Sequence, residues 1–239
     1  MTARVDPQAL AASLRRLQER DAEVLQPSLR RIVDACAQLF GLDGSGVMLA
    51  DEQGALRFVV TTDGAGRELE DAQRDAGQGP CLDTFVDDEP TSCESIRADP
   101  RYPALAARLS GHAVDAVLTV PLRLSHTVVG TLNVHTADPR RWSRAERDAL
   151  SRYGEIAEAM LSAAVSADQA GELAAQLNYA LDYRAPIERG VGYLMARDGL
   201  DQAAAFHRLR TAARSNRRRI GEVAEDLLRS GRLPGEGPG

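Results

Sequence analysis

Lysine is absent from this 239-residue sequence, so all 29 basic side chains are arginines, and 35 acidic residues give a net charge of −6. An acidic chain does not coat nucleic acid over its whole surface, which confines any polyanion site to a local basic cluster. Long apolar runs are absent too: no stretch approaches the roughly 20 residues of a membrane-spanning helix. Charged residues interrupt the N-terminal segment, so it lacks the apolar core of a secretory signal. We expect a cytoplasmic protein that does not bind membranes.

Cysteine is scarce as well. Cys36, Cys81 and Cys93 are odd in number and lack CxxC spacing, which fits neither a disulfide framework nor a zinc site. The four histidines are scattered without metal-ligand spacing. No Ser/His/Asp order, phosphate loop or paired-carboxylate signature stands out. We therefore expect no enzyme and no metal or other cofactor, although an unknown small molecule can still be a ligand.

The basic residues that are present gather near the C-terminal end. No acidic residue occurs between Gln202 and Gly221, and six arginines lie in that interval: Arg208, Arg210, Arg214, Arg217, Arg218 and Arg219. A charge run is often only a solvated helix face, and Arg210, which has apolar neighbours, can instead bond to another helix. Guanidinium groups nevertheless make planar, bidentate contacts with phosphates and stack on bases. In an acidic chain the cluster favours one anionic partner, and we expect RNA rather than DNA.

Hydrophobic periodicity divides the rest of the chain into helical and extended segments. Spacings of three and four predict helices over residues 8–25 and 28–40, with a break at Pro27. Alternation then predicts strands, of which the last two form a hairpin: residues 47–49, 56–62, 113–124 and 128–136. Short helices or loops are expected over residues 67–75 and 80–86. This order predicts an α+β fold around an antiparallel sheet.

A long helix follows the sheet. Ser143 and Glu146 have the spacing of a capping box, with serine at the N-cap and glutamate at N3. Apolar residues at coiled-coil-like spacing continue beyond Gly171, until Pro186 kinks or restarts the helix. We expect them to form the seam of a homodimer: Leu150, Tyr153, Ala157, Met160, Leu173, Leu177 and Leu181.

Two further helices are predicted at the C-terminal end. Gly199 suits a helix stop and Asp201 an N-cap, which predicts a helix over residues 202–214. A last helix is expected over residues 217–229, so that its three leading arginines would lie where free backbone N–H groups favour phosphate. Asn216 would either cap that helix or form a hydrogen bond with a base.

Three stretches in these helices have a characteristic spacing: RAPIERGVGYLM at residues 184–195, AAF followed by LR at residues 204–210, and IGEVA at residues 220–224. Together they resemble the ANTAR domain, a three-helix RNA-binding module of bacterial transcription antitermination regulators. In many members of that family a basic residue precedes the glycine that corresponds to Gly192, whereas this chain has Val191. The resemblance implies RNA binding by the arginine cluster.

The preceding part carries a looser pattern, formed by GQGPCLD at residues 77–83, VPL at residues 120–122 and VGTLNV at residues 129–134. It resembles a GAF domain, an α+β fold that senses small molecules, and implies that Gly79, Cys81 and Asp83 lie near a ligand. GAF followed by ANTAR is a familiar arrangement in actinobacterial regulators. The resemblance divides the chain into an N-terminal helix (1–26), a GAF-like sensor (27–165), an ANTAR-like domain (166–230) and a tail (231–239).

The resemblance implies a dimeric antiterminator that responds to a signal and binds tandem RNA hairpins in transcript leaders. Two alternatives are open. Certain GAF proteins reduce free methionine sulfoxide with cysteines, and a thiol reductase or redox sensor of this kind would need Cys81 to be reactive at its helix N-terminus. A protein-binding dimer, in which Val191 reflects lost RNA binding, is the other.

Overall fold

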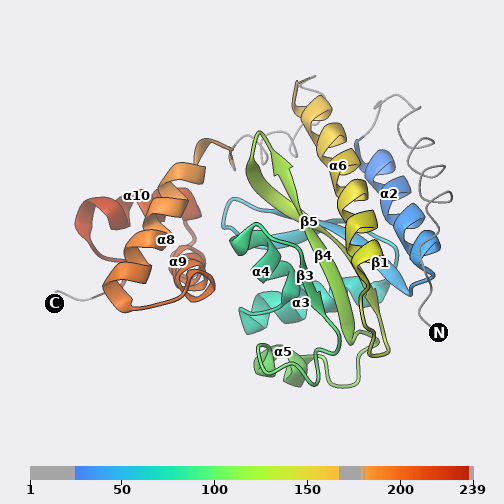
Figure 1. Ribbon diagram of the computed structural model, residues 1–239. Helices are drawn as coiled ribbons and strands as arrows, with labels where there is room; N and C mark the ends of the chain where they lie inside the picture. The colour runs from blue at the N-terminus through green and yellow to red at the C-terminus, as the bar shows by residue number, and fades with distance from the viewer. Residues whose placement is uncertain (1–24, 167–178, 180, 237–239) are drawn as a thin grey trace.

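The computed structural model describes residues 25–166, 179 and 181–236 (Figure 1). Its elements in chain order are α2 (Leu25–Phe40), β1 (Gly44–Ala50), β2 (Leu56–Thr61), α3 (Gly64–Ala76), α4 (Pro80–Asp87), β3 (Thr91–Cys93), α5 (Pro103–Arg108), β4 (Ala116–Leu124), β5 (Thr127–Thr136), α6 (Arg144–Ser166), α8 (Arg184–Asp198), α9 (Gln202–Ser215) and α10 (Ile220–Ser230). The fold is α+β, as predicted. The helix expected over residues 8–25 falls almost entirely outside the described residues. The break expected at Pro27 is wrong, because α2 runs from Leu25 through Pro27.

The strands form one antiparallel sheet in the order β2-β1-β5-β4-β3. β4 and β5 are rich in valine, leucine and threonine, and they form the predicted hairpin. Ser125 and His126 make its two-residue turn with φ angles of 48° and 72°, the backbone that matches the twist of paired strands. β3 and α5 were not predicted because neither has more than six residues, which is too short for a periodic signal.

Helices cover both faces of the sheet (Figure 1). On one face, α2 and α6 lie side by side and pack against alternate strand residues such as Val47 and Leu49. On the opposite face, α3, α4 and α5 enclose a second core that includes Met48 and Val117. The alternation of successive strand side chains between two covered faces explains why β1 is buried at every position.

The last three helices pack around a core of their own (Figure 1). Leu194 from α8, Leu209 from α9 and Leu227 from α10 are all fully buried there. Gly190 lets α8 approach α10 closely, since a Cβ atom at this position would lie 3.2 Å from the Cβ of Ala224. A three-helix C-terminal bundle is therefore present, as predicted.

Three local capping signals of the sequence are confirmed. The Ser143 hydroxyl accepts a hydrogen bond from the Glu146 amide at 3.2 Å, and the Glu146 carboxylate accepts one from the Ser143 amide at 2.7 Å. Asp201 accepts a hydrogen bond from the Ala204 amide at 2.7 Å and begins α9. Gly199 ends α8 with a φ of 67°.

The dimer seam expected along α6 is wrong for three of its residues. Leu150, Tyr153 and Ala157 are fully buried within a single chain, where they pack against α2 and the sheet. Met160 and Leu181 are partly buried against the same core, whereas Leu173 and Leu177 lie outside the described residues. The apolar periodicity of α6 thus comes from its packing against the sheet of the same chain. An apolar face on a helix indicates that the face is buried, but it does not indicate which element buries it.

Candidate nucleic-acid interface

The arginine cluster lies on α9 and in the turn that leads into α10. Arg214, in the last turn of α9, and Arg217, in the connecting turn, are both exposed. Neither guanidinium has a carboxylate partner among the residues that the structure describes. Arg217 adopts a φ of 51°, an uncommon backbone for a non-glycine residue, and it marks the sharp reversal of the chain between the two helices. These two arginines are the available cations of the cluster.

Three other arginines are already paired; Arg208 and Arg219 are exposed, and Arg218 is half-buried. Arg208 lies 2.9 Å from Asp198 and 2.9 Å from Glu236. Arg218 lies 2.6 Å from Asp226. Exposed ion pairs of this kind contribute only about 0–1 kcal/mol, so a phosphate can displace the carboxylate at little cost. Arg219 differs because its partner, Glu52 at 2.9 Å, belongs to the turn between β1 and β2.

Arg210 is not on the exposed face. It is 6% exposed, and its guanidinium donates to the carbonyl oxygen of Arg74 at the end of α3 at 3.3 Å. Burial lowers its pKa, and the positive charge of Arg214 adds to that effect. Of the two roles open to Arg210 in the sequence, the structure shows the bond to a neighbouring helix.

The start of α10 differs from the prediction. The helix begins at Ile220 rather than Arg217, because the amides of Arg217 and Arg218 donate to the carbonyls of Arg214 and Ala213 in the preceding turn. The first amides of α10 are already satisfied, one by the Glu52 carbonyl and one by the Tyr179 hydroxyl. Asn216 also acts on the other helix: its side chain donates to the Ala212 carbonyl at 2.8 Å and so caps the end of α9. Side chains, not a free helix terminus, offer the positive charge here.

The sequence did not reveal a buried polar cluster between the sheet and the helices α3 and α4. Its members are Gln73, Cys81, Thr84, Thr119, Thr131 and Asn133, all buried. Polar side-chain atoms of five of them, all except Cys81, have no hydrogen-bond partner among the described residues. Such atoms are rare in folded proteins and indicate a polar occupant, either water or a ligand. The sequence does contain one signal of this cluster: residues 131, 133 and 135 of β5 are polar, and alternate residues of a strand lie on the same face.

The three residues proposed for ligand binding have different surroundings. Cys81 belongs to the buried polar cluster, and burial raises the pKa of its thiol to about 11. Gly79 is the residue before α4, and any side chain there would overlap that of Gln73. Asp83 accepts a hydrogen bond from the Tyr102 hydroxyl at 2.5 Å, and burial raises its pKa. Only Cys81 therefore contributes a side chain to the polar cluster.

Comparison with known families agrees with both parts of the fold. The family model of the GAF domain matches residues 24–161, and that of the ANTAR domain matches residues 175–228. The chain is a GAF–ANTAR protein. GAF and ANTAR domains are sensory and regulatory, and the ANTAR domain indicates RNA binding. No curated protein matches the sequence significantly.

Solved structures resemble the GAF domain of this GAF–ANTAR protein. The GAF domain of an Acinetobacter phosphoenolpyruvate-protein phosphotransferase has 16% identity and a TM-score of 0.53, over 66% of this chain and 93% of that one. The free methionine-R-sulfoxide reductase from Neisseria meningitidis, solved with its substrate, has 15% identity and a TM-score of 0.52, over 70% and 99% of the two chains. A domain of a two-component sensor histidine kinase protein from Sinorhizobium meliloti 1021 has 20% identity and a TM-score of 0.50, over 62% and 99%. At these identities the likeness shows the fold alone.

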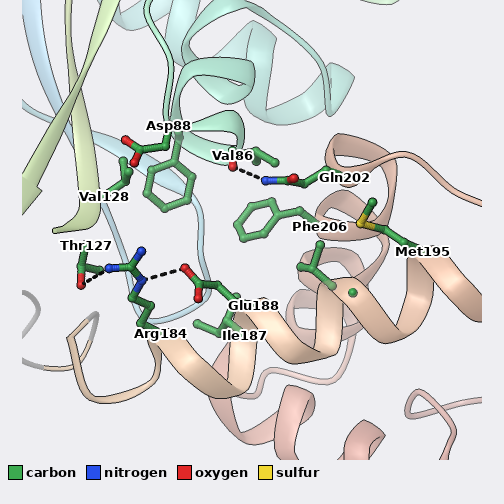
Figure 2. Close-up of a pocket in the computed structure, with 13 residues that line it drawn as sticks. Val86, Asp88, Thr127, Val128, Arg184, Ile187, Glu188, Met195, Gln202 and Phe206 are labelled. Atoms are coloured by element: carbon green, nitrogen blue, oxygen red, sulfur yellow. Dashed lines mark hydrogen bonds and ion pairs between the residues drawn. The ribbon is translucent and has the colours of Figure 1, made fainter.

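The ANTAR domain is docked on the GAF domain (Figure 2). Phe206 of α9 packs edge-on against Phe85 of α4, with ring centroids 5.7 Å apart, and Gln202 donates to the Val86 carbonyl at 2.5 Å. Arg184 reaches from α8 to the Thr127 hydroxyl at 3.1 Å and pairs with Glu188 at 2.7 Å. A cavity of about 410 Å³ remains between the domains, lined mainly by apolar side chains. It is bordered by α4, the start of β5 and the helices α8 and α9.

Val191, the residue that stands where many ANTAR domains have a basic side chain, is buried. It is 7% exposed in the core of the ANTAR domain and also borders the interdomain cavity. A side chain at this position faces inward in the docked arrangement, so that the valine satisfies a packing requirement. Its presence therefore does not by itself argue for lost RNA binding.

Proposed function

We propose that this GAF–ANTAR protein is a signal-regulated antiterminator that binds stem-loops in nascent transcripts. The observation that carries the proposal is the pair of exposed guanidinium groups of Arg214 and Arg217, which have no carboxylate partner among the described residues, in a domain whose family indicates RNA binding. Neutralising phosphates releases condensed counterions and supplies affinity, whereas stacking on unpaired loop bases supplies selectivity. RNA held in this way cannot fold into the stem of a terminator.

The GAF domain supplies the regulatory input in this proposal. A small polar molecule that reaches the buried polar cluster would satisfy side-chain atoms of Gln73, Thr84 and Asn133 that otherwise lack partners. Its binding free energy would then favour one arrangement of the two domains over another. An allosteric coupling of about 1–3 kcal/mol is enough to change RNA affinity by about 5–150-fold.

The thiol alternative loses its main support. Cys36, Cys81 and Cys93 are all buried and free, and burial raises the pKa of each thiol, to about 11 for Cys81 and about 12 for Cys93. A thiol that stays protonated at neutral pH is a poor nucleophile. The fold shared with a methionine sulfoxide reductase is therefore not by itself a reason to propose that chemistry here.

The test of the proposal is the double variant Arg214→Gln with Arg217→Gln. We expect at least about a tenfold loss of affinity for an RNA pool of adjacent stem-loops with randomised loops, because a hydrogen bond to a charged group contributes about 1.5–3 kcal/mol. The salt dependence of binding should also become shallower by about 0.7–0.9 per lost phosphate contact.

Its matched control is Arg141→Gln with Arg144→Gln, which changes the net charge equally. These two arginines are 87% and 94% exposed on the GAF side of the chain. If both double variants weaken RNA binding equally, only the overall charge matters and the α9–α10 turn is not the interface.

A further inference from the structure

Two segments of the GAF domain hold the ANTAR domain at the arginine cluster. The first is the turn between β1 and β2: the Glu52 carboxylate pairs with Arg219 at 2.9 Å, and its carbonyl accepts the Ile220 amide at 3.0 Å. The second is the end of α3, where the Arg74 carbonyl accepts a hydrogen bond from Arg210. We call these two contacts together with the Phe85–Phe206 packing the latch.

The latch hides positive charge that RNA would use. Arg210 is buried by it, and Arg219 is neutralised by Glu52. The first backbone donor of α10, the amide of Ile220, is also occupied by the GAF domain. Separation of the domains would free two of the six clustered arginines and this amide at once, next to the already available Arg214 and Arg217.

Helix α4 connects the latch to the buried polar cluster. Cys81 and Thr84, three residues apart, are fully buried and lie on the side of α4 that carries the polar cluster. Leu82 and Phe85 join the core of the ANTAR domain from the same short helix. Gln73 fixes the start of α4, because its side-chain carbonyl accepts the Cys81 amide at 2.9 Å. One helix of eight residues thus contacts the buried polar cluster on one side and the ANTAR domain on the other.

The docked contact is built to separate. A pocket of about 410 Å³, open to solvent on one side, lies between the domains beside the Phe85–Phe206 contact (Figure 2), so this part of the interface is not close-packed. Interiors that must stay closed are packed at close to crystal density. A contact with a large gap and a few polar bonds is easier to open by a ligand of modest affinity.

From these observations we infer that the GAF domain is an intramolecular inhibitor of RNA binding, and that a change at the buried polar cluster moves α4 and opens the latch. The inference rests on the proposed RNA-binding function. In the docked state the cluster offers Arg214 and Arg217, and in the released state it also offers Arg210 and Arg219. Apparent affinity then falls in proportion to the fraction of molecules that are docked.

The experiment compares wild-type protein with a release variant, Glu52→Gln with Gln202→Ala, in the full chain. Both side chains are at least partly exposed and bond across the contact between the two domains, so their loss should spare the fold. A second release variant, Phe85→Ala, removes the aromatic contact instead. Hydrogen exchange at the Ile220 amide reports domain separation without RNA, and filter binding to the pool of adjacent randomised stem-loops reports affinity.

We expect faster exchange at Ile220 and RNA binding about tenfold tighter or more, which corresponds to a wild-type protein that is about 90% docked or more. The salt dependence should steepen by about 0.7–0.9 for each newly available arginine. Glu94→Gln is the matched control, since Glu94 pairs with Arg141 at 3.6 Å within the GAF domain and its loss changes the charge equally. This control should leave both measurements unchanged.

Three outcomes would overturn the inference, and they differ in what else they affect. If exchange at Ile220 rises but wild type and release variants bind RNA equally, the latch does not inhibit, and the proposed RNA-binding function still stands. If no form binds the pool even at low salt, the RNA-binding function fails and the inhibition fails with it. Unchanged exchange in both release variants would show that the latch is not what holds the domains together.

Discussion

Arg210 and Arg214 are four residues apart on α9, yet one guanidinium is buried at the domain contact and the other faces water. Both residues are arginines, so the difference comes from the orientation of α9 about its own axis against the GAF domain. Buried charge is costly unless it is bonded, and the Arg74 carbonyl supplies that bond for Arg210. At the scale of single residues, function therefore depends on which cations the fold leaves available.

Glu146 gives a pH-dependent prediction at the same scale. Burial raises the pKa of its carboxyl, but hydrogen bonds from Arg140 at 2.5 Å and from Ser143 outweigh burial, and the pKa is lowered overall. A carboxyl with a lowered folded pKa stabilises the protein above its unfolded pKa, about 4.3 for glutamate. That stabilisation is lost as the pH falls through the folded pKa.

Glu146→Gln should therefore lower the free energy of unfolding by about 1.5–3 kcal/mol at pH 7, and the difference from wild type should shrink below about pH 4. Urea unfolding at the two pH values checks this. Glu155→Gln, at an exposed position of the same helix, is the control and should cost little at either pH. An equal difference at both pH values would show that the carboxylate charge is not what stabilises the capping box.

At the scale of elements, capping residues determine where the helices of the ANTAR domain begin and end. Asp201 caps α9 through the Ala204 amide, and α9 is also the helix that carries Phe206, Arg210 and Arg214. Fraying of its first turn would loosen the contact of Gln202 with Val86 as well. The N-cap thus supports both the bundle and its docking.

Asp201→Ala should destabilise the protein by about 1 kcal/mol, because the first turn of α9 loses a side-chain acceptor. Asp201→Asn keeps an oxygen in the same place and should cost much less, since asparagine is also a strong N-cap residue. Thermal unfolding of both variants measures the difference. Equal losses would indicate that the charge of Asp201, and not its capping bond, is what matters.

The elements also show how far the sequence leads. The capping box at Ser143, the end of α8 at Gly199 and the β4–β5 hairpin were predicted because each depends on local chemistry. The start of α10 was misplaced because arginine favours helices, and nothing local shows that the chain reverses at Arg217. The burial of Arg210 and the buried polar cluster depend on segments far apart in the sequence, which periodicity does not join.

At the scale of the whole molecule, homodimerisation remains a prediction from the sequence. The core of the GAF domain buries Leu150, Tyr153 and Ala157. The apolar pattern that continues past Gly171 is therefore the remaining candidate for the dimer seam. Its residues Leu173 and Leu177 lie outside the described part of the chain.

None of the helices in the described part of the chain combines the length and the apolar character that a bilayer span requires.

Leu177→Glu should give a monomer in light scattering, because a carboxylate at a coiled-coil core position disfavours pairing. Leu150→Ala is an informative contrast: it should leave the oligomeric state unchanged and lower the free energy of unfolding by about 2–5 kcal/mol, since Leu150 is core. A dimer that survives Leu177→Glu would place the interface elsewhere, for example on the helix predicted from the sequence over residues 8–25.

Two glycines of the docked surface limit how this sensor can be exchanged for another. Gly54 has a φ of 71°, and a Cβ atom there would lie 2.7 Å from Cδ1 of Ile220; Gly77 has a φ of 68°, and a side chain there would overlap the His207 ring. A chimera that joins a foreign GAF domain to this ANTAR domain would keep the same docked arrangement only if both positions remain glycine. Grafts without them should produce a constitutively active fusion, a property that a reporter screen can select.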